Sequence, residues 1–319
     1  MPLTSAVCAA NMTATSSARR HHYVPQGYLG CFTDKGTKTG QFFVLDVDSG
    51  RKFRTSPKNV AVEIDFNRID VEGYPPDYIE HMLGQMEDDA IAAIRRVADS
   101  RAFPSDEDYS AILHLICLIA VRNPTMRASF NAAREQSIRI IGDLLVSDKS
   151  IWANHVEKAR ANGIDIPDSV SFQDMKAFIE GGEYEIDFHP QSNLRVEMNA
   201  FDKMLPVLHE RTWSLIIAPE DGPEFITSDH PVALTFKNDR LGPIGLATKG
   251  TELFFPLTRN LGMYGAHEDA LRKVVEAKPR GVAKLNQRVA STAPRYIFSA
   301  KDHFAVCVNG QIELIECGV

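Results

Sequence analysis

The chain has few cysteines, and their spacing does not predict a disulfide bond between any two of them. Five are spread along 319 residues without a C-x-x-C motif: Cys8, Cys31, Cys117, Cys307 and Cys317. An odd number at wide spacing favours neither a disulfide framework nor a zinc site of the zinc-finger type. We therefore expect a reducing, cytoplasmic location.

Long apolar runs are also missing. The longest, Ile112 to Val121, has ten residues and includes His114, which is about half of what a membrane-spanning helix needs. Residues 1–19 are rich in Ser, Thr and Ala, and their apolar piece is too short for a secretory signal. The sequence therefore predicts a disordered tail over residues 1–19 and no membrane partner.

The chain lacks both an excess of positive charge and the common nucleotide motifs. Its net charge is -7 and its pI is near 5.8, which does not fit a protein that grips nucleic acid mainly through phosphates, although a local basic cleft is compatible with it. No phosphate loop, dinucleotide-binding glycine motif, H-E-x-x-H or G-x-S-x-G occurs. The absence of these motifs therefore argues against a protein that binds nucleoside triphosphates or dinucleotides and against the common hydrolase classes.

A dense group of reactive side chains lies near the N-terminus, in residues 20–29 with the sequence RHHYVPQGYL. His21 and His22 can bind a metal ion, or act as one base and one donor. Gln26 adds a side-chain amide to them. Pro25 fixes the backbone, and it can equally open a short helix while the histidines pack on a sheet. Function and structure explain this segment equally well.

A second group lies in residues 225–232, FITSDHPV, where apolar strand residues run into a turn. Asp229 could act as a base or a metal ligand, or form a turn before the proline. Ser228, Asp229 and His230 are the three residue types of a catalytic triad. Because they are adjacent in an extended chain, their side chains point in different directions and cannot form a relay with one another.

Helical periodicity dominates residues 75–147. The second predicted helix begins after Ser105, which can cap it, and runs to about Val121. Its interior is almost wholly apolar, so it should be the central helix. Arg122 at its end carries a permanent charge that needs an acceptor: a carbonyl, a carboxylate or a bound anion. Residues 148–212 have the pattern of a helical insert.

Short strands replace helices from Trp213 onwards. Strand patterns occur at 213–218, 224–227, 232–236, 253–257, 261–264 and 296–299, followed by a hairpin that turns at Asn309-Gly310. An earlier hairpin turns at 48–50. We expect an α+β fold in one domain over residues 20–319, with the helical N-terminal half packed on a mostly antiparallel sheet formed by the C-terminal half plus the N-terminal hairpin.

The order of the motifs resembles DUF4238, a family named for its unknown function. The motifs are HHYVPQ at 21–26, RNP at 122–124, FITSDHPV at 225–232, FPL at 255–257, Asn286 and the strand at 296–299. The resemblance covers roughly residues 20 to 300. The chain departs from the family at His230, where an Asn is common. The resemblance implies an architecture and a candidate site, but no reaction.

We expect these motifs to form one composite site at an end of the sheet, where ligand sites often lie. The candidate catalytic residues are His22, Arg122, Asp229 and Asn286. The candidate binding residues are His21, Gln26, Ser228 and His230. In this hypothesis His22 and Asp229 share one pocket, where they act as bases or hold a divalent metal ion.

Two functions fit such a site. The first is a hydrolase of phosphodiester or related bonds, acting on a small molecule or a nucleic acid. The second is a non-enzymatic regulatory protein that binds a small ligand or a partner. An open pocket containing His22, Asp229 and Arg122 would favour the enzyme, whereas a buried and fully paired cluster would favour a structural or a binding role.

Overall fold

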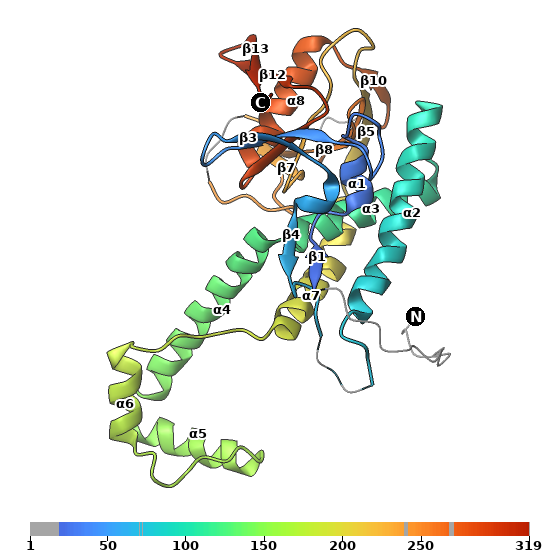
Figure 1. Ribbon diagram of the computed structural model, residues 1–319. Coiled ribbons are helices and arrows are strands. Elements are labelled where there is room, and N and C mark those ends of the chain that lie inside the picture. Colours follow the sequence, from blue (N-terminus) through green and yellow to red (C-terminus); the bar gives the residue numbers. More distant parts are fainter. Residues whose placement is uncertain (1–18, 70, 72, 239–241, 268–270, 319) are drawn as a thin grey trace.

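The computed structural model describes residues 19–69, 71, 73–238, 242–267 and 271–318 (Figure 1). Most helices precede residue 210 and most strands follow it, which confirms the α+β fold. The predicted tail at residues 1–19 lies, except for Arg19, outside the described residues.

The N-terminal part provides short strands around one short helix. In order these are β1 (Arg20–His22), α1 (Gln26–Gly30), β2 (Phe42–Asp46), β3 (Lys52–Thr55), the 3-10 helix η1 (Pro57–Asn59) and β4 (Val62–Ile64). β1 pairs with β4, and β2 pairs with β3 as the predicted hairpin. α1 begins directly after Pro25, whose φ of -58° suits a helix start.

Six helices follow: α2 (Tyr78–Ser100), α3 (Asp106–Val121), α4 (Pro124–Leu145), α5 (Lys149–Ala161), α6 (Phe172–Gly181) and α7 (Pro190–His209). Ser105 caps α3 as predicted, since its hydroxyl accepts a hydrogen bond from the Asp108 N–H at 3.2 Å. No helix among the described residues is long and apolar enough to cross a membrane.

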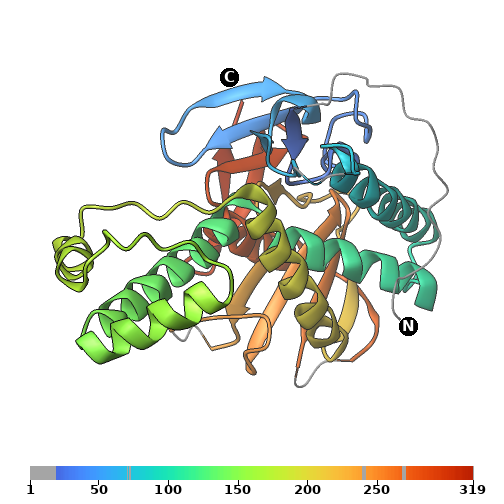
Figure 2. The same ribbon diagram turned by 90° about the horizontal axis from the view of Figure 1, so that it is seen from below.

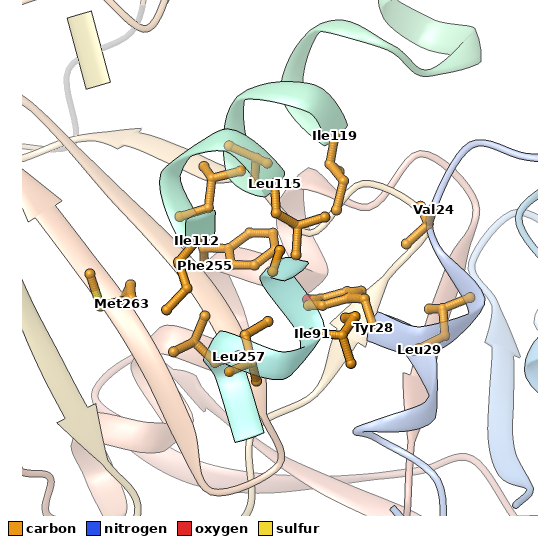
Figure 3. Packing of buried hydrophobic residues seen from close by; sticks show 14 of the residues in the cluster. Val24, Tyr28, Leu29, Ile91, Ile112, Leu115, Ile119, Phe255, Leu257 and Met263 are labelled. Atoms are coloured by element: carbon orange, nitrogen blue, oxygen red, sulfur yellow. The ribbon is translucent and has the colours of Figure 1, made fainter. Parts of the chain in front are cut away.

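The centre of the molecule is α3. Nine of its last ten residues, Ile112 to Val121, are buried, His114 being the exception. Figure 3 shows Ile112, Leu115 and Ile119 facing apolar side chains of β8 and β9 and the ring of Tyr28. Figure 2 shows α3 and α7 crossing the orange strands. The predicted central helix is therefore confirmed.

The predicted helical insert has two different parts. Neither α5 nor α6 has a buried residue, and both lie away from the sheets, beyond the far end of α4 (Figure 1). In contrast, α7 returns to the core, where Leu194 and Leu208 are buried against the rest of the molecule. We call α5 and α6 together the arm.

The C-terminal part provides most of the sheet strands. Its elements are β5 (Thr212–Ile217), β6 (Thr227–Ser228), β7 (Ala233–Phe236), β8 (Thr251–Thr258), β9 (Leu261–Ala266), β10 (Val274–Glu276), α8 (Pro279–Thr292), β11 (Tyr296–Ser299), β12 (His303–Val308) and β13 (Gln311–Glu316). One sheet has the order β10-β5-β9-β8-β7, and a second has the order β3-β2-β11-β6. All their pairs are antiparallel except β10 with β5.

The strands are thus divided between two main sheets. The N-terminal hairpin joins the C-terminal strands through the pairing of β2 with β11. The second sheet therefore places β2 and β6 on either side of β11, although they are far apart in sequence.

Candidate functional site

A buried tyrosine ties three of the sequence motifs together. The Tyr28 hydroxyl donates to the Pro256 carbonyl at 2.8 Å and lies 2.8 Å from the Thr227 hydroxyl. Its ring stacks on Phe255, with centroids 5.1 Å apart. The segment 20–29 and the motifs at 225–232 and 255–257 therefore meet in space, as a composite site requires.

A cavity of about 390 Å³ lies where β1 and β4 approach the end of β6, and we call it the Asp229 cavity. Its wall comprises Tyr23, Phe53, Asn59, Val60, Ala61, Val62, Glu63, Asn123, Pro124, Thr125, Asp229, Pro294, Arg295 and Tyr296. Of the sequence-predicted site residues, only Asp229 lies in it. Polar side chains from five segments of the chain line it.

The Asp229 carboxyl is held at the end of β6. Its Oδ1 accepts a hydrogen bond from the Arg295 N–H at 3.4 Å, and its own N–H donates to the Tyr296 carbonyl at 3.1 Å. Burial raises the pKa of Asp229 to about 6, against the opposing effect of the neighbouring backbone N–H groups. Near neutral pH this carboxyl can both take and return a proton.

Tyr23 also lines the Asp229 cavity, although it is not among the site residues predicted from the sequence. It follows β1, its N–H donates to the Ala61 carbonyl at 3.0 Å, and its ring lies 6.1 Å from that of Phe66. Burial, and then the charge of Asp229, raise the pKa of Tyr23 above its usual range, so the phenol stays protonated. Its place in the HHYVPQ motif was the available signal.

Two features of the same cavity favour negative charge, although its lining also includes the Glu63 carboxylate. Arg295 lines it while its Nε donates to the Asp46 carboxylate at 3.2 Å. The first turn of α4 also faces it. Asn123 caps this helix by accepting from the Met126 N–H at 3.0 Å, whereas by helix geometry the Thr125 N–H has no partner within the helix. Such a terminus favours negative charge.

His21 and Arg122 belong to a separate buried network. The Asn67 N–H donates to His21 Nδ1 at 2.7 Å, and the Asn67 side-chain oxygen accepts from Arg122 Nη1 at 3.1 Å. Arg122 Nη2 lies 3.5 Å from a Glu87 carboxylate oxygen. Burial raises the pKa of Glu87 to about 7, while the Arg122 charge acts in the opposite direction. The acceptor of Arg122 is therefore an amide and a carboxylate.

His22 lines a different and smaller cavity of about 100 Å³, together with Gln26, Glu80 and Glu87. The Gln26 side-chain amide donates to His22 Nδ1 at 3.3 Å. Burial lowers the pKa of His22, so its imidazole is neutral at pH 7. His22 and Asp229 thus line different cavities, and the predicted shared pocket is not found.

Asn286 and Ser228 hold backbone in place. The buried Asn286 amide donates to the carbonyls of Glu224 and Ala305 and accepts from the Ile226 N–H. These three bonds fix α8 against two chain segments. The Ser228 hydroxyl accepts from the His230 N–H at 3.1 Å, so the turn before Pro231 is made by Ser228 and not by the Asp229 side chain. Neither residue lines the Asp229 cavity.

His230 faces away from its neighbour Asp229, into a third cavity. Among the described residues, no three His, Cys, Asp or Glu side chains come together in a way that could hold a metal ion. The residues present therefore do not fit the divalent metal site that was expected at His22 and Asp229.

One family matches most of the chain. A family model described as "Protein of unknown function (DUF4238)" matches residues 20–303. No curated protein and no solved structure matches the chain. The matched range includes every residue of the Asp229 cavity.

Proposed function

Since the chain belongs to the DUF4238 family, which is defined without a function, we propose its function from the site alone: it is a hydrolase with Asp229 as the acid–base group. The observation that carries this proposal is a buried carboxyl with a pKa of about 6 at the wall of a 390 Å³ cavity. Enzymes tune carboxyl groups into this range by burial, because the best base titrates near the working pH.

In the reaction, the ionised Asp229 takes a proton from a water molecule as its oxygen attacks the substrate. The Arg295 N–H fixes one carboxylate oxygen, which leaves the other for the water. The protonated Tyr23 hydroxyl donates a hydrogen bond to a substrate oxygen. Asp229 then returns its proton to the leaving oxygen, so that the group is restored.

The substrate class is a phosphodiester or a related anionic ester, either as a small molecule or as the end of a nucleic acid. The first turn of α4 and the Arg295 guanidinium, which also pairs with Asp46, favour negative charge in the Asp229 cavity against the opposing charge of Glu63. The four described cysteines, Cys31, Cys117, Cys307 and Cys317, are free thiols, which suits a cytoplasmic enzyme.

The second candidate is a protein that binds a small ligand without chemistry. The pairing of Arg122 with Asn67 and Glu87 favours it, because this cluster is buried and both terminal nitrogens of Arg122 have partners within the protein. In that case Asp229→Asn would change ligand affinity, and no product would form.

The test is hydrolysis of bis(p-nitrophenyl) phosphate by the full chain, with p-nitrophenyl butyrate as the carboxylic ester control. We expect turnover of the phosphodiester, with a rate that rises as pH passes about 6. Asp229→Asn should lower kcat by about 100-fold or more, and Tyr23→Phe by a smaller factor. His22→Ala serves as the matched control and should retain the rate, because His22 lines another cavity.

Two results would contradict the proposal. One is turnover by Asp229→Asn within about twofold of the unaltered chain, a loss far smaller than removal of a general base causes. The other is no turnover of either compound. Turnover of the butyrate ester alone would keep the role of Asp229 and overturn the phosphodiester assignment.

A further inference from the structure

A cavity of about 620 Å³ lies beside the Asp229 cavity, and we call it the apolar cavity. Its walls come from the end of α3, the start of α4, one face of α7, and β7 with the chain beyond it. Val121, Met204, Val232 and Leu234 are typical of its lining. Cavities of this size and character are usual for small molecules that are largely hydrocarbon.

Two chain segments separate the apolar cavity from the Asp229 cavity. Asp229 lines the Asp229 cavity, and the next residue, His230, lines the apolar cavity. In the same way, Thr125 lines the Asp229 cavity and Met126 lines the apolar cavity. Neither Asp229 nor Tyr23 reaches the apolar cavity. A site in it would therefore be additional to the proposed hydrolase site.

His230, which lines the apolar cavity, has a ring nitrogen without a partner. His230 Nδ1 is buried, and no described residue hydrogen-bonds to it. Burial lowers the pKa of His230 to about 4, so the imidazole is neutral at neutral pH and can carry its proton on Nδ1. A buried nitrogen left unpaired costs free energy, and a ligand that pairs with it recovers that cost.

The charges around the apolar cavity have one sign. Lys203 of α7 lines it and forms no ion pair with a described residue. No Asp or Glu is among the described residues that line it. Charge complementarity therefore favours a ligand with an anionic end. This end would lie close to the Lys203 ammonium group and to the neutral imidazole N–H of His230.

We propose that the apolar cavity is a binding site for an apolar carboxylic acid of small-molecule size. The hydrocarbon part packs on Val121, Val232 and Leu234, where burial of apolar surface drives binding. The carboxylate accepts a hydrogen bond from His230 Nδ1–H and pairs with the Lys203 ammonium. A carboxylate can only accept, so it selects the tautomer of His230 with the proton on Nδ1.

The test is isothermal titration calorimetry of the full chain with decanoic acid and with decanol, at a pH where the acid is ionised. Decanoate should bind at least about tenfold more tightly than decanol, since a hydrogen bond to a charged group contributes about this factor. His230→Leu and Lys203→Gln should each weaken decanoate binding by about tenfold. Lys203→Gln should leave decanol binding unchanged, because an alcohol carries no charge to pair with the ammonium group.

Cavity filling gives the matched pair of variants. Ala200→Trp adds a large ring to a residue that lines the apolar cavity, and it should abolish binding of both compounds. Ala132→Trp places the same ring on an exposed residue of α4 outside this lining and should bind like the unaltered chain. Lys203 is exposed, so Lys203→Gln tests the charge without disturbing the core.

Three results would overturn the proposal: no binding of decanoate, equal binding of decanoate by Ala200→Trp, or decanol binding as tight as decanoate. None of them depends on turnover at Asp229. The apolar site and the hydrolase can therefore fail independently.

Discussion

At the residue scale, a difference of one position decides which side chain meets Asp229. His22 and Tyr23 are neighbours in sequence, yet Tyr23 lines the Asp229 cavity and His22 lines another. β1 ends at His22, and Tyr23 lies one residue beyond it, where its N–H donates to the Ala61 carbonyl at 3.0 Å. The motif HHYVPQ identified the segment, and the tertiary structure selected the residue.

The buried Asp229 carboxyl gives a pH-dependent stability. Its pKa is about 6 in the folded protein and near 3.8 in a solvated chain. The folded state thus binds the proton more tightly, and this contribution is fully present below about pH 4 and is lost as pH rises through 6. At higher pH, ionisation of the buried group costs roughly 2–3 kcal/mol.

Asp229→Asn removes that cost, because the amide stays neutral. We expect the variant to be more stable than the unaltered chain by roughly 1–3 kcal/mol near pH 8, with no gain near pH 4. Urea unfolding at a series of pH values measures the difference. A gain that is the same at every pH would show that Asp229 does not titrate as described.

At the element scale, α3 joins the helical half to the sheets. Its side chains pack on β8, on β9 and on α1 (Figure 3), so that one helix touches both the first motif and the FPL motif. The Ser105 cap and the apolar run were readable in the sequence because both are local. Which strands the helix covers depends on contacts between residues that are far apart in the chain.

Leu115 lies fully buried in the middle of α3. We expect Leu115→Ala to lower the free energy of unfolding by about 2–5 kcal/mol, through lost apolar burial and a residual cavity. Ile138→Ala on α4, where the side chain is exposed, is the control and should change stability by about 0.5 kcal/mol or less. Chemical denaturation measures both. Equal effects would place α3 outside the core.

At the scale of the whole molecule, a packed body of helices and sheets contrasts with the arm of α5 and α6. The body contains every residue of the two apolar core clusters, whereas the arm contributes none. Both proposed sites lie in the body. The arm is therefore not needed to build either of them.

We expect amide hydrogens in the arm to exchange with solvent well before those of α3. Helices without buried side chains open locally at little cost in free energy, while α3 opens only when the core unfolds. Hydrogen exchange followed by mass spectrometry measures the two rates in one experiment, with α7 as the internal comparison. Protection of the arm equal to that of α3 would contradict this description.

The sequence by itself determined the features that depend on neighbouring residues. These include the α+β class, the cap at Ser105, the short helix after Pro25, the turn at Asn309-Gly310 and the segments that carry the site. Capping, periodicity and turn geometry act over a few residues, so they can be read from the chain alone.

Only the tertiary structure decided what those segments do together. It divided the strands into two sheets, paired Arg122 with Asn67 and Glu87, and used Asn286 to hold backbone. It also turned Asp229 and His230 into different cavities. Burial, and with it the pKa of Asp229, depends on residues that come from distant parts of the chain. No local pattern encodes which of them will meet.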